Sequence, residues 1–141
     1  MSPILLVEDD ENDVFFFKLA AKKAGIERPI IIAGDGLQAK SCLEAGEVNQ
    51  RPSLVFLDLK LPKMSGVEVL QWVRSQRALA TMVIVILTSS EADKDIRACY
   101  EGGANSYLVK PSKTEELVHL LKMADQYWFN ANRIPSLLAR L

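Results

Sequence analysis

Side chains that could bind a metal ion and a phosphoryl group come directly after short apolar runs at separate points of the chain. Carboxylates follow the first and third runs, a hydroxyl follows the fourth and an amine follows the fifth, at Glu8, Asp9, Asp58, Thr88 and Lys110. Neighbouring carboxylates raise one another's pKa unless a cation lies among them. Because the group contains no His or Cys, a hard cation such as Mg²⁺ fits it best. We expect Asp9 and Asp58 to bind Mg²⁺ directly, with Glu8 helping through a water.

The same residues could carry out phosphoryl transfer. Lys110 supplies a fixed positive charge and Thr88 a hydroxyl donor, and with the metal they would stabilise a phosphoryl group in transfer. Asp58 comes at the tip of an apolar run and can act as the nucleophile, which would give an aspartyl phosphate. Each residue type also has an ordinary role, since a lone Asp after a strand often caps a turn or a helix. The prediction therefore depends on all of them falling after particular strands of one fold.

Five short strands alternating with five helices would position these side chains. The apolar runs predict strands at residues 3–7, 29–33, 54–57, 82–87 and 106–109. Helical spacing predicts helices at residues 14–24, 37–45, 67–74, 92–101 and 114 to about 129, and Asp10 and Glu11 suit the N-terminus of the first one. Runs that are apolar on both faces indicate a parallel sheet covered by helices on both sides. We therefore predict a doubly wound α/β domain whose strands all end at one ligand-binding edge.

The length and composition fit a single globular domain. The chain has 141 residues, of which 49% are hydrophobic, and this is enough for a core without disulfides. Its 17 basic and 18 acidic residues nearly cancel, so we do not expect a nucleic-acid surface. No apolar run approaches the roughly 20 residues that a membrane span needs, so we expect no membrane association. Cys42 and Cys99 belong to no metal or redox motif, and free thiols lead us to expect a cytoplasmic protein.

Four motifs make the chain resemble the receiver domains of two-component response regulators. The match covers residues 3 to about 127, and the motifs are Leu6-Val7-Glu8-Asp9, Leu57-Asp58-Leu59-Lys60-Leu61-Pro62 with Gly66, Leu87-Thr88-Ser89, and Tyr107-Leu108-Val109-Lys110-Pro111. The resemblance implies the flavodoxin-like receiver fold, a five-stranded parallel sheet flanked by five helices. It also implies that a sensor histidine kinase phosphorylates Asp58, and that Glu8 and Asp9 form the acidic pocket.

The resemblance assigns further roles at the same site. Asp9 would coordinate Mg²⁺ directly, the backbone carbonyl of Lys60 would be a further ligand, and Thr88 and Lys110 would contact the phosphoryl oxygens. Tyr107 matches the aromatic switch of the family. Phosphorylation would draw the Thr88 hydroxyl inward, and Tyr107 would turn toward the vacated space. The face formed by the fourth helix, fifth strand and fifth helix would then change its partners.

A few positions qualify the resemblance. Glu8 stands where Asp is equally usual. Lys60 brings a positive side chain close to the site, and we predict that Lys60 and Ser90 set the lifetime of the phosphate by controlling where water attacks. Ser112 replaces the Phe that often follows Lys-Pro, so we expect the last loop to pack differently. His119 lies off the apolar stripe of the last helix, and we expect it on a solvated helix face rather than in phosphotransfer.

The end of the chain resembles that of one group of single-domain receivers. We assign residues 1–129 to the receiver domain and residues 130–141 to a C-terminal tail, which we expect to form a short helix packed on the domain or on a partner chain. Trp128 followed by a short apolar tail is similar to response regulators paired with cyanobacterial and bacterial phytochromes. This similarity implies a light-sensing histidine kinase as phosphodonor, and a homodimer through the face of the fourth helix, fifth strand and fifth helix. No DNA-binding or catalytic output segment follows, so we expect a stand-alone receiver.

Other function classes share some of these features. Phosphatases of the haloacid-dehalogenase type also use a strand-end Asp with Thr or Ser, Lys and Mg²⁺. Their nucleophile follows the first strand, however, and they need a second Asp where this chain has Lys60. A docking module that works without phosphorylation does not need the acidic pocket. This chain keeps the acidic pocket, which disfavours that alternative. A dinucleotide domain is disfavoured because no Gly-x-Gly-x-x-Gly follows a strand. We therefore expect a switch that catalyses only its own phosphorylation and dephosphorylation, and not an enzyme with a separate substrate.

Overall fold

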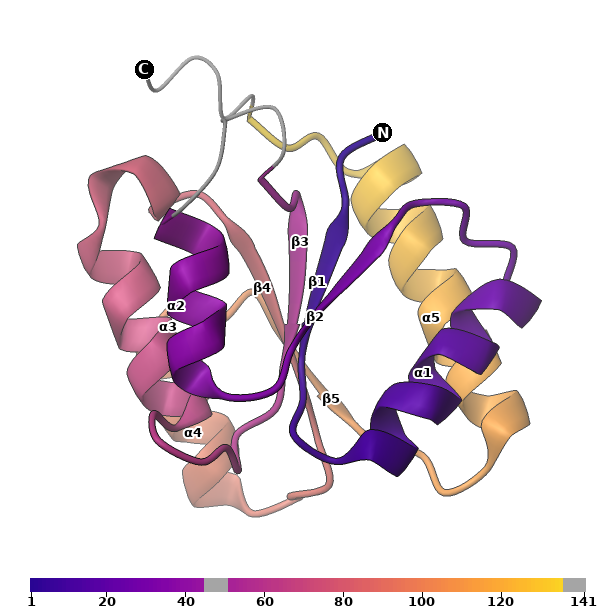
Figure 1. Cartoon of the computed structure of the whole chain (residues 1–141), viewed down its shortest axis with the longest axis horizontal. Coiled ribbons are helices and arrows are strands. Elements are labelled where there is room, and N and C mark those ends of the chain that lie inside the picture. The colour runs from indigo at the N-terminus through magenta and orange to yellow at the C-terminus, as the bar shows by residue number, and fades with distance from the viewer. Residues whose placement is uncertain (45–50, 136–141) are drawn as a thin grey trace.

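Five parallel strands form the centre of the protein, and helices cover both faces of their sheet (Figure 1). The computed structural model describes residues 1–44 and 51–135. The strands are β1 (Ile4–Val7), β2 (Ile30–Ala33), β3 (Leu54–Leu57), β4 (Val83–Thr88) and β5 (Ser106–Val109), in the order β2-β1-β3-β4-β5. The helices are α1 (Glu11–Lys23), α2 (Gly36–Glu44), α3 (Gly66–Ser75), α4 (Asp93–Glu101) and α5 (Thr114–Gln126). The prediction of a doubly wound α/β fold is confirmed.

The register of the sheet brings the ends of its central strands level with one another. Val7 of β1 lies opposite Leu57 of β3, and Leu57 lies opposite Ile86 of β4. The order of the strands reverses at β1, because β2 pairs with one side of β1 and β3 with the other. Loops that follow the strands at such a point diverge and leave a crevice between them. Glu8 and Asp58, the next residues after β1 and β3, therefore emerge side by side at this crevice.

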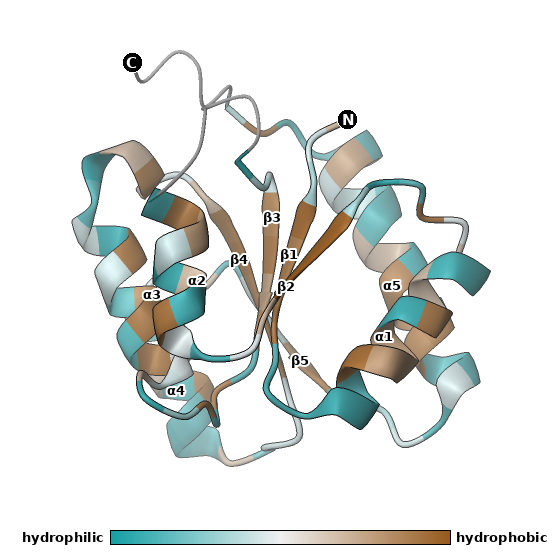
Figure 2. Ribbon diagram, viewed as in Figure 1, coloured by the Kyte–Doolittle hydropathy of each residue, from teal (hydrophilic) through white to brown (hydrophobic). Residues whose placement is uncertain are grey.

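Two apolar layers hold the helices against the sheet. Helices α1 and α5 cover one face, helices α2, α3 and α4 cover the other, and their apolar residues turn toward the strands (Figure 2). Every residue of β1, β3 and β4 is buried, as predicted for strands that are apolar on both faces. The edge strands differ, since Ile31 of β2 and Val109 of β5 are each 36% exposed. An edge strand has a neighbouring strand on one side only, so an apolar sequence does not guarantee its burial.

The end of α5 differs from the single helix expected to about residue 129. The α-helix stops at Gln126, and a π-helical turn covers Tyr127–Ala131. The guanidinium of Arg28, just before β2, lies 3.6 Å from the centre of the Phe129 ring and also donates to Ser2. A cation–π contact of this kind contributes about 0.5–1 kcal/mol at an exposed site. It fastens the turn after α5 to the end of the sheet at which the strands begin.

Two expectations fall partly outside the described residues. The C-terminal tail assigned to residues 130–141 includes residues 136–141, and the expected second helix included Ala45; neither is among the residues described. Of the described part of the tail, Ile134 packs against the apolar layer under α1 and α5.

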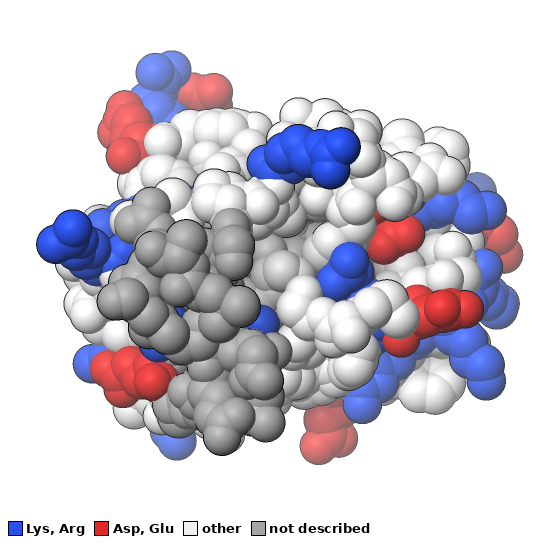
Figure 3. Space-filling view, turned by 90° about the horizontal axis from the view of Figure 1, so that it is seen from above, with Lys and Arg blue, Asp and Glu red and all other residues white. Residues whose placement is uncertain are grey.

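Charges of both signs are intermixed on the face at the N-terminal ends of the strands (Figure 3). Within residues 1–44 and 51–135, the helices are too short or too polar to cross a lipid bilayer.

Arg74 of α3 holds the start of β4 in place from the side. Its guanidinium donates to the backbone carbonyls of Gly103 at 2.9 Å, Met82 at 2.8 Å and Ala80 at 3.2 Å. It also donates to Asn105 Oδ1 at 3.0 Å, and the same Asn105 oxygen accepts the backbone N–H of Ile84 in β4 at 2.7 Å. One side chain therefore satisfies acceptors on the segment before β4 and on the segment after α4.

We predict that Arg74→Met lowers the free energy of unfolding by about 2–3 kcal/mol, because partly buried carbonyls lose their donor. Urea denaturation followed by circular dichroism would measure the change. Arg97→Met is the matched control, since Arg97 is exposed and, among the residues the structure describes, its ion pair is with Asp93 one helical turn away at 3.4 Å. Arg97→Met should lower the free energy of unfolding by no more than about 0.5 kcal/mol. Equal decreases in the two variants would contradict the role of Arg74.

Candidate functional site

Three carboxylates gather in the crevice between β1 and β3. Oxygen atoms of Glu8, Asp9 and Asp58 lie within 4.8 Å of one another. Glu8 and Asp58 are buried, whereas Asp9 is exposed at the mouth of the crevice. Carboxylate oxygens around one point, with an open side for water, are the donor set that a hard divalent cation prefers. The structure thus brings together all three carboxylates that the sequence singled out as metal ligands.

The position of Asp58 follows from the way β3 ends. The Asp58 N–H donates to Val7 O at 3.1 Å, which extends the ladder between β1 and β3 by one bond. The chain then turns, and the Leu59 N–H donates to Asp58 Oδ1 at 2.7 Å. The first residue of α3, Gly66, comes back against this turn and donates to Leu59 O at 3.0 Å. A Cβ atom on Gly66 would lie 2.7 Å from the Leu59 Cα and would collide with the Asp58 carbonyl, so only glycine fits there.

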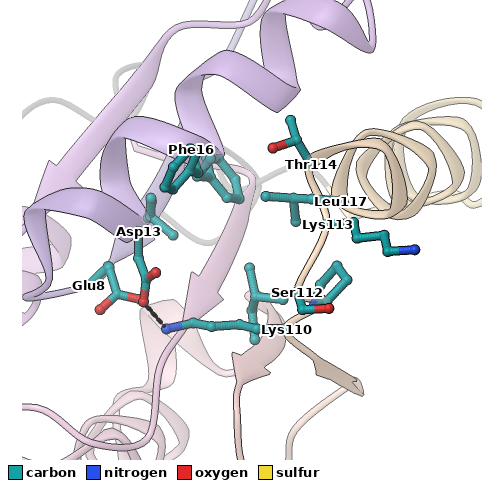
Figure 4. Close-up of a pocket in the computed structure, with 12 residues that line it drawn as sticks. Glu8, Asp13, Phe16, Lys110, Ser112, Lys113, Thr114 and Leu117 are labelled. Carbon is teal, nitrogen blue, oxygen red and sulfur yellow. Dashed lines mark hydrogen bonds and ion pairs between the residues drawn. The ribbon is translucent and has the colours of Figure 1, made fainter.

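Lys110 reaches from the end of β5 across to the acidic group (Figure 4). Its Nζ donates to Asp58 Oδ2 at 3.1 Å, to Asp13 Oδ2 at 2.9 Å and to Glu8. Its backbone N–H donates to Thr88 O at 2.8 Å, which fixes the start of the side chain. Burial disfavours the charged amine, but the hydrogen bonds to Glu8 and Asp13 and the charge of Asp58 outweigh it and raise the pKa of Lys110. Lys110 is therefore a permanent positive charge at physiological pH.

Glu8 is the most enclosed acid of the group. Burial raises the pKa of Glu8, while hydrogen bonds from Lys110 and from the Asp10 N–H oppose that rise and the charge of Asp58 adds to it. A divalent cation beside Glu8 would relieve the same repulsion. The electrostatics of the group thus favour an added positive charge.

Thr88 and Tyr107 lie on the neighbouring strands β4 and β5. Thr88 is fully buried, and its hydroxyl has no hydrogen-bond partner among the described residues. Tyr107 is half-buried, and its hydroxyl donates to the backbone carbonyl of Ser90 at 2.9 Å. The Ser90 hydroxyl in turn donates to Asp95 Oδ2 at 2.5 Å. Tyr107 is therefore bonded to the loop that follows Thr88.

The β3–α3 loop is held by the loop that follows β2. Asp35 is only 6% exposed; it accepts the Gln38 N–H at 2.8 Å and lies 3.5 Å from Lys63 Nζ. The Gln38 hydrogen bond and the charge of Lys63 lower the pKa of Asp35. Gly36 packs so closely that a Cβ atom would lie 2.7 Å from the Met64 carbonyl carbon. These contacts position the loop that carries Lys60, whose side chain is exposed. The role of the Lys60 carbonyl as a metal ligand stays a prediction.

Asp13 is a site residue that the sequence did not reveal. Asp10 caps α1 by accepting the N–H groups of Asn12 at 2.8 Å and Asp13 at 3.0 Å, as expected for an acid before a helix. The helix thus begins right after the acidic pocket. Helical side chains lean toward the N-terminus of their helix, so a first-turn carboxylate reaches back over the pocket. That lean is the signal from which Asp13 could have been found.

The remaining reactive side chains have the ordinary roles expected of them. Burial and the charge of Asp95 raise the pKa of Cys99 to about 11, and burial also raises that of Cys42, so neither is a reactive thiolate. His119 is exposed on α5.

We predict that Gly66→Ala weakens Mg²⁺ binding on the order of tenfold, because the added methyl group must push the turn at Asp58 out of place. Isothermal titration calorimetry with Mg²⁺ would measure it. Gly34→Ala, in a loop after β2, is the control, since a Cβ atom there would make only an ordinary contact, 3.5 Å from Gln38. If both variants bind Mg²⁺ like the wild type, the tight turn does not matter for the metal.

Comparison with known proteins assigns the chain to a family. The model of the response regulator receiver domain matches residues 4–122. Response regulator Rcp1 of Synechocystis sp. is 34% identical over 136 residues, which cover 94% of this chain and 92% of Rcp1. Its Mn²⁺-bound crystal structure matches with a TM-score of 0.83 at 33% identity, over 96% of this chain and 99% of that chain.

Two further solved structures are similar over nearly the whole chain. The phosphorylated cyanobacterial phytochrome response regulator RcpA matches with a TM-score of 0.86 at 30% identity, over 96% of this chain and 99% of that chain. The bacteriophytochrome response regulator RtBRR matches with a TM-score of 0.74 at 38% identity, over 99% of this chain and 89% of that chain. With its strand order, its acidic crevice and these relatives, the chain belongs to the receiver domain family of two-component response regulators.

Proposed function

We propose that this receiver is a phosphoacceptor switch, in which Asp58 takes a phosphoryl group from a sensor histidine kinase with Mg²⁺ bound beside it. The observation that carries the proposal is the contact between Lys110 Nζ and Asp58 Oδ2 at 3.1 Å, next to the oxygens of Glu8 and Asp9. The similar proteins support this use of the site, because one solved relative is phosphorylated and another is bound to Mn²⁺.

Asp58 is arranged to attack phosphorus. The Leu59 N–H fixes Oδ1 and Lys110 fixes Oδ2, so the carboxylate is oriented before the donor arrives. One oxygen would form the new P–O bond as the P–N bond of the donor phosphohistidine breaks, and the imidazole would keep the bonding electrons. Lys110 and the Thr88 hydroxyl would then hold the phosphoryl oxygens.

The metal would be held by Asp9, Asp58 and the backbone carbonyl of Lys60, with Glu8 acting through a water. Bound there, Mg²⁺ would neutralise charge on the phosphoryl oxygens.

The switch would start at Thr88, whose hydroxyl has no partner among the described residues and could turn to a phosphoryl oxygen. The loop after Thr88 would follow, and Tyr107 would move with it, because its hydroxyl is bonded to Ser90 in that loop. Such a change is a shift of population between two arrangements, driven by the added charge.

The face of α4, β5 and α5 is the surface that this shift would alter, and we propose it as the homodimer interface. Large apolar side chains are exposed on all three elements and on the turn after α5, at Tyr100, Val109, Met123 and Tyr127. Large apolar side chains left exposed in this way are typical of an interaction surface.

We propose a phytochrome-type histidine kinase as the phosphodonor, because two of the similar structures are named as phytochrome or bacteriophytochrome response regulators. Free thiols at Cys42 and Cys99 favour a reducing compartment, which suits a cytoplasmic switch.

The proposal predicts that acetyl phosphate with Mg²⁺ adds one phosphoryl group to the wild type and none to Asp58→Asn. Intact-mass spectrometry would measure the modification, and removing Mg²⁺ with a chelator should abolish it. Size-exclusion chromatography with beryllofluoride would show whether the modified state dimerises. Modification of Asp58→Asn to the same extent would overturn the assignment of the site, whereas an unmodified wild type that still binds its partners would favour a docking module.

The lifetime of the phosphate gives a second test. Lys60→Ala should hydrolyse its phosphate faster, by a factor on the order of a few, because the shortened side chain opens a path for water to the phosphorus. The decay of phosphorylated protein, followed by intact mass after the donor is removed, would measure it. Lys94→Ala removes the same charge from the exposed first turn of α4 and is the control. Equal decay in Lys60→Ala and the wild type would contradict the role of Lys60.

A further inference from the structure

Asp13 is hydrogen-bonded to Lys110 but lies outside the group of carboxylates that could hold a cation. Lys110 Nζ donates to Asp13 Oδ2 at 2.9 Å, which is shorter than its 3.1 Å bond to Asp58. The oxygens that converge on one point belong to Glu8, Asp9 and Asp58, and Asp13 is not among them. A cation bound to that group would weaken the hold of Glu8 and Asp58 on the ammonium. Asp13 would keep its own hold.

A cavity of about 280 Å³ lies beside Lys110, on the side where Asp13 is found (Figure 4). Its wall includes Glu8, Asp13, Phe16, Lys110 and Ser112, whereas Asp9 and Asp58 do not line it. The side chain of Lys110 therefore has free space on its Asp13 side. The ammonium group can lie toward Asp58 or away from it, toward Asp13.

We propose that Asp13 is a positioning residue that holds Lys110 partly away from Asp58 and so limits how firmly the site binds a phosphoryl group. This inference rests on the proposed function of Asp58. An ammonium group has three N–H donors, and in this structure they serve Glu8, Asp13 and Asp58. A phosphoryl group on Asp58 brings new acceptor oxygens. Lys110 can turn its third donor to them by giving up the bond to Asp13.

Removing the charge of Asp13 should change the two ligands of the site in opposite directions. Asp13→Asn takes one negative charge away from the neighbourhood of the cation, so Mg²⁺ should bind about two- to threefold more weakly. At saturating Mg²⁺ the same variant should bind beryllofluoride about three- to tenfold more tightly, because Lys110 is released to the phosphoryl position and a repelling charge is gone. Reaction with acetyl phosphate should become faster by a similar factor. A role in helix stability alone would not separate the two ligands in this way.

Glu11→Gln is the matched control for Asp13→Asn. Glu11 lies on the same first turn of α1, so both variants lose one acid that favours the N-terminus of the helix. Glu11 is exposed and makes no ion pair within the described part of the chain. Thermal unfolding of both variants would show that α1 remains folded. The difference between them isolates the contact with Lys110.

The experiment titrates Mg²⁺, and then beryllofluoride at saturating Mg²⁺, into the wild type, Asp13→Asn and Glu11→Gln. Weaker Mg²⁺ binding together with tighter beryllofluoride binding in Asp13→Asn alone supports the inference. Equal beryllofluoride affinity in the three proteins overturns it, while modification of the wild type at Asp58 would leave the proposed function in place. A wild type that acetyl phosphate does not modify overturns the proposed function itself.

Discussion

Negative charge at the carboxyl edge of the sheet is the constraint that the rest of the structure must satisfy. Glu8 and Asp58 are buried there, Asp9 and Asp13 stand beside them, and the ammonium of Lys110 is the group that meets three of the four. Burying such charges costs several kcal/mol each unless they are paired. A buried ion pair is weak evidence for stability, because apolar residues of similar volume often stabilise the folded state equally well. Under the proposed function, the cluster is a site kept charged for a second cation and a phosphoryl group.

The fold meets this constraint through the backbone. The parallel register sets the ends of β1, β3 and β4 level, so the acids and Thr88 start from one edge. The contact of Gly66 with the turn after Asp58, and that of Gly36 with Met64, then hold the β3–α3 loop close to this edge. On the opposite side, Tyr107 is bonded to the loop after β4. One side of the site is thus tightly packed, while on the other side the loop after β4 is joined to β5 through the hydroxyl of Tyr107, a contact that can exchange.

The elements and the acidic crevice could be predicted from the sequence because both depend on local patterns. Continuous apolar runs marked β1, β3 and β4, and polar side chains came at their carboxyl ends, with carboxylates after β1 and β3 and the Thr88 hydroxyl at the end of β4. The features that were missed depend on contacts between segments distant in sequence. The contact of Asp13 with Lys110 joins residues 97 positions apart, and the ion pair of Asp35 with Lys63 joins two separate loops. The exposure of Ile31 and the π-helical turn after α5 likewise depend on tertiary neighbours.

Lys63 has a left-handed backbone conformation, with φ of 68°, although it carries a side chain. For a residue other than glycine that conformation costs roughly 1–2 kcal/mol. Its ion pair with Asp35, at 3.5 Å and with the lysine largely exposed, returns about 0–1 kcal/mol. The ion pair therefore does not offset the backbone strain at Lys63. Its effect is to fix the position of the β3–α3 loop. Selection for heat resistance alone would favour glycine at this position, and that change would remove the lysine that pairs with Asp35.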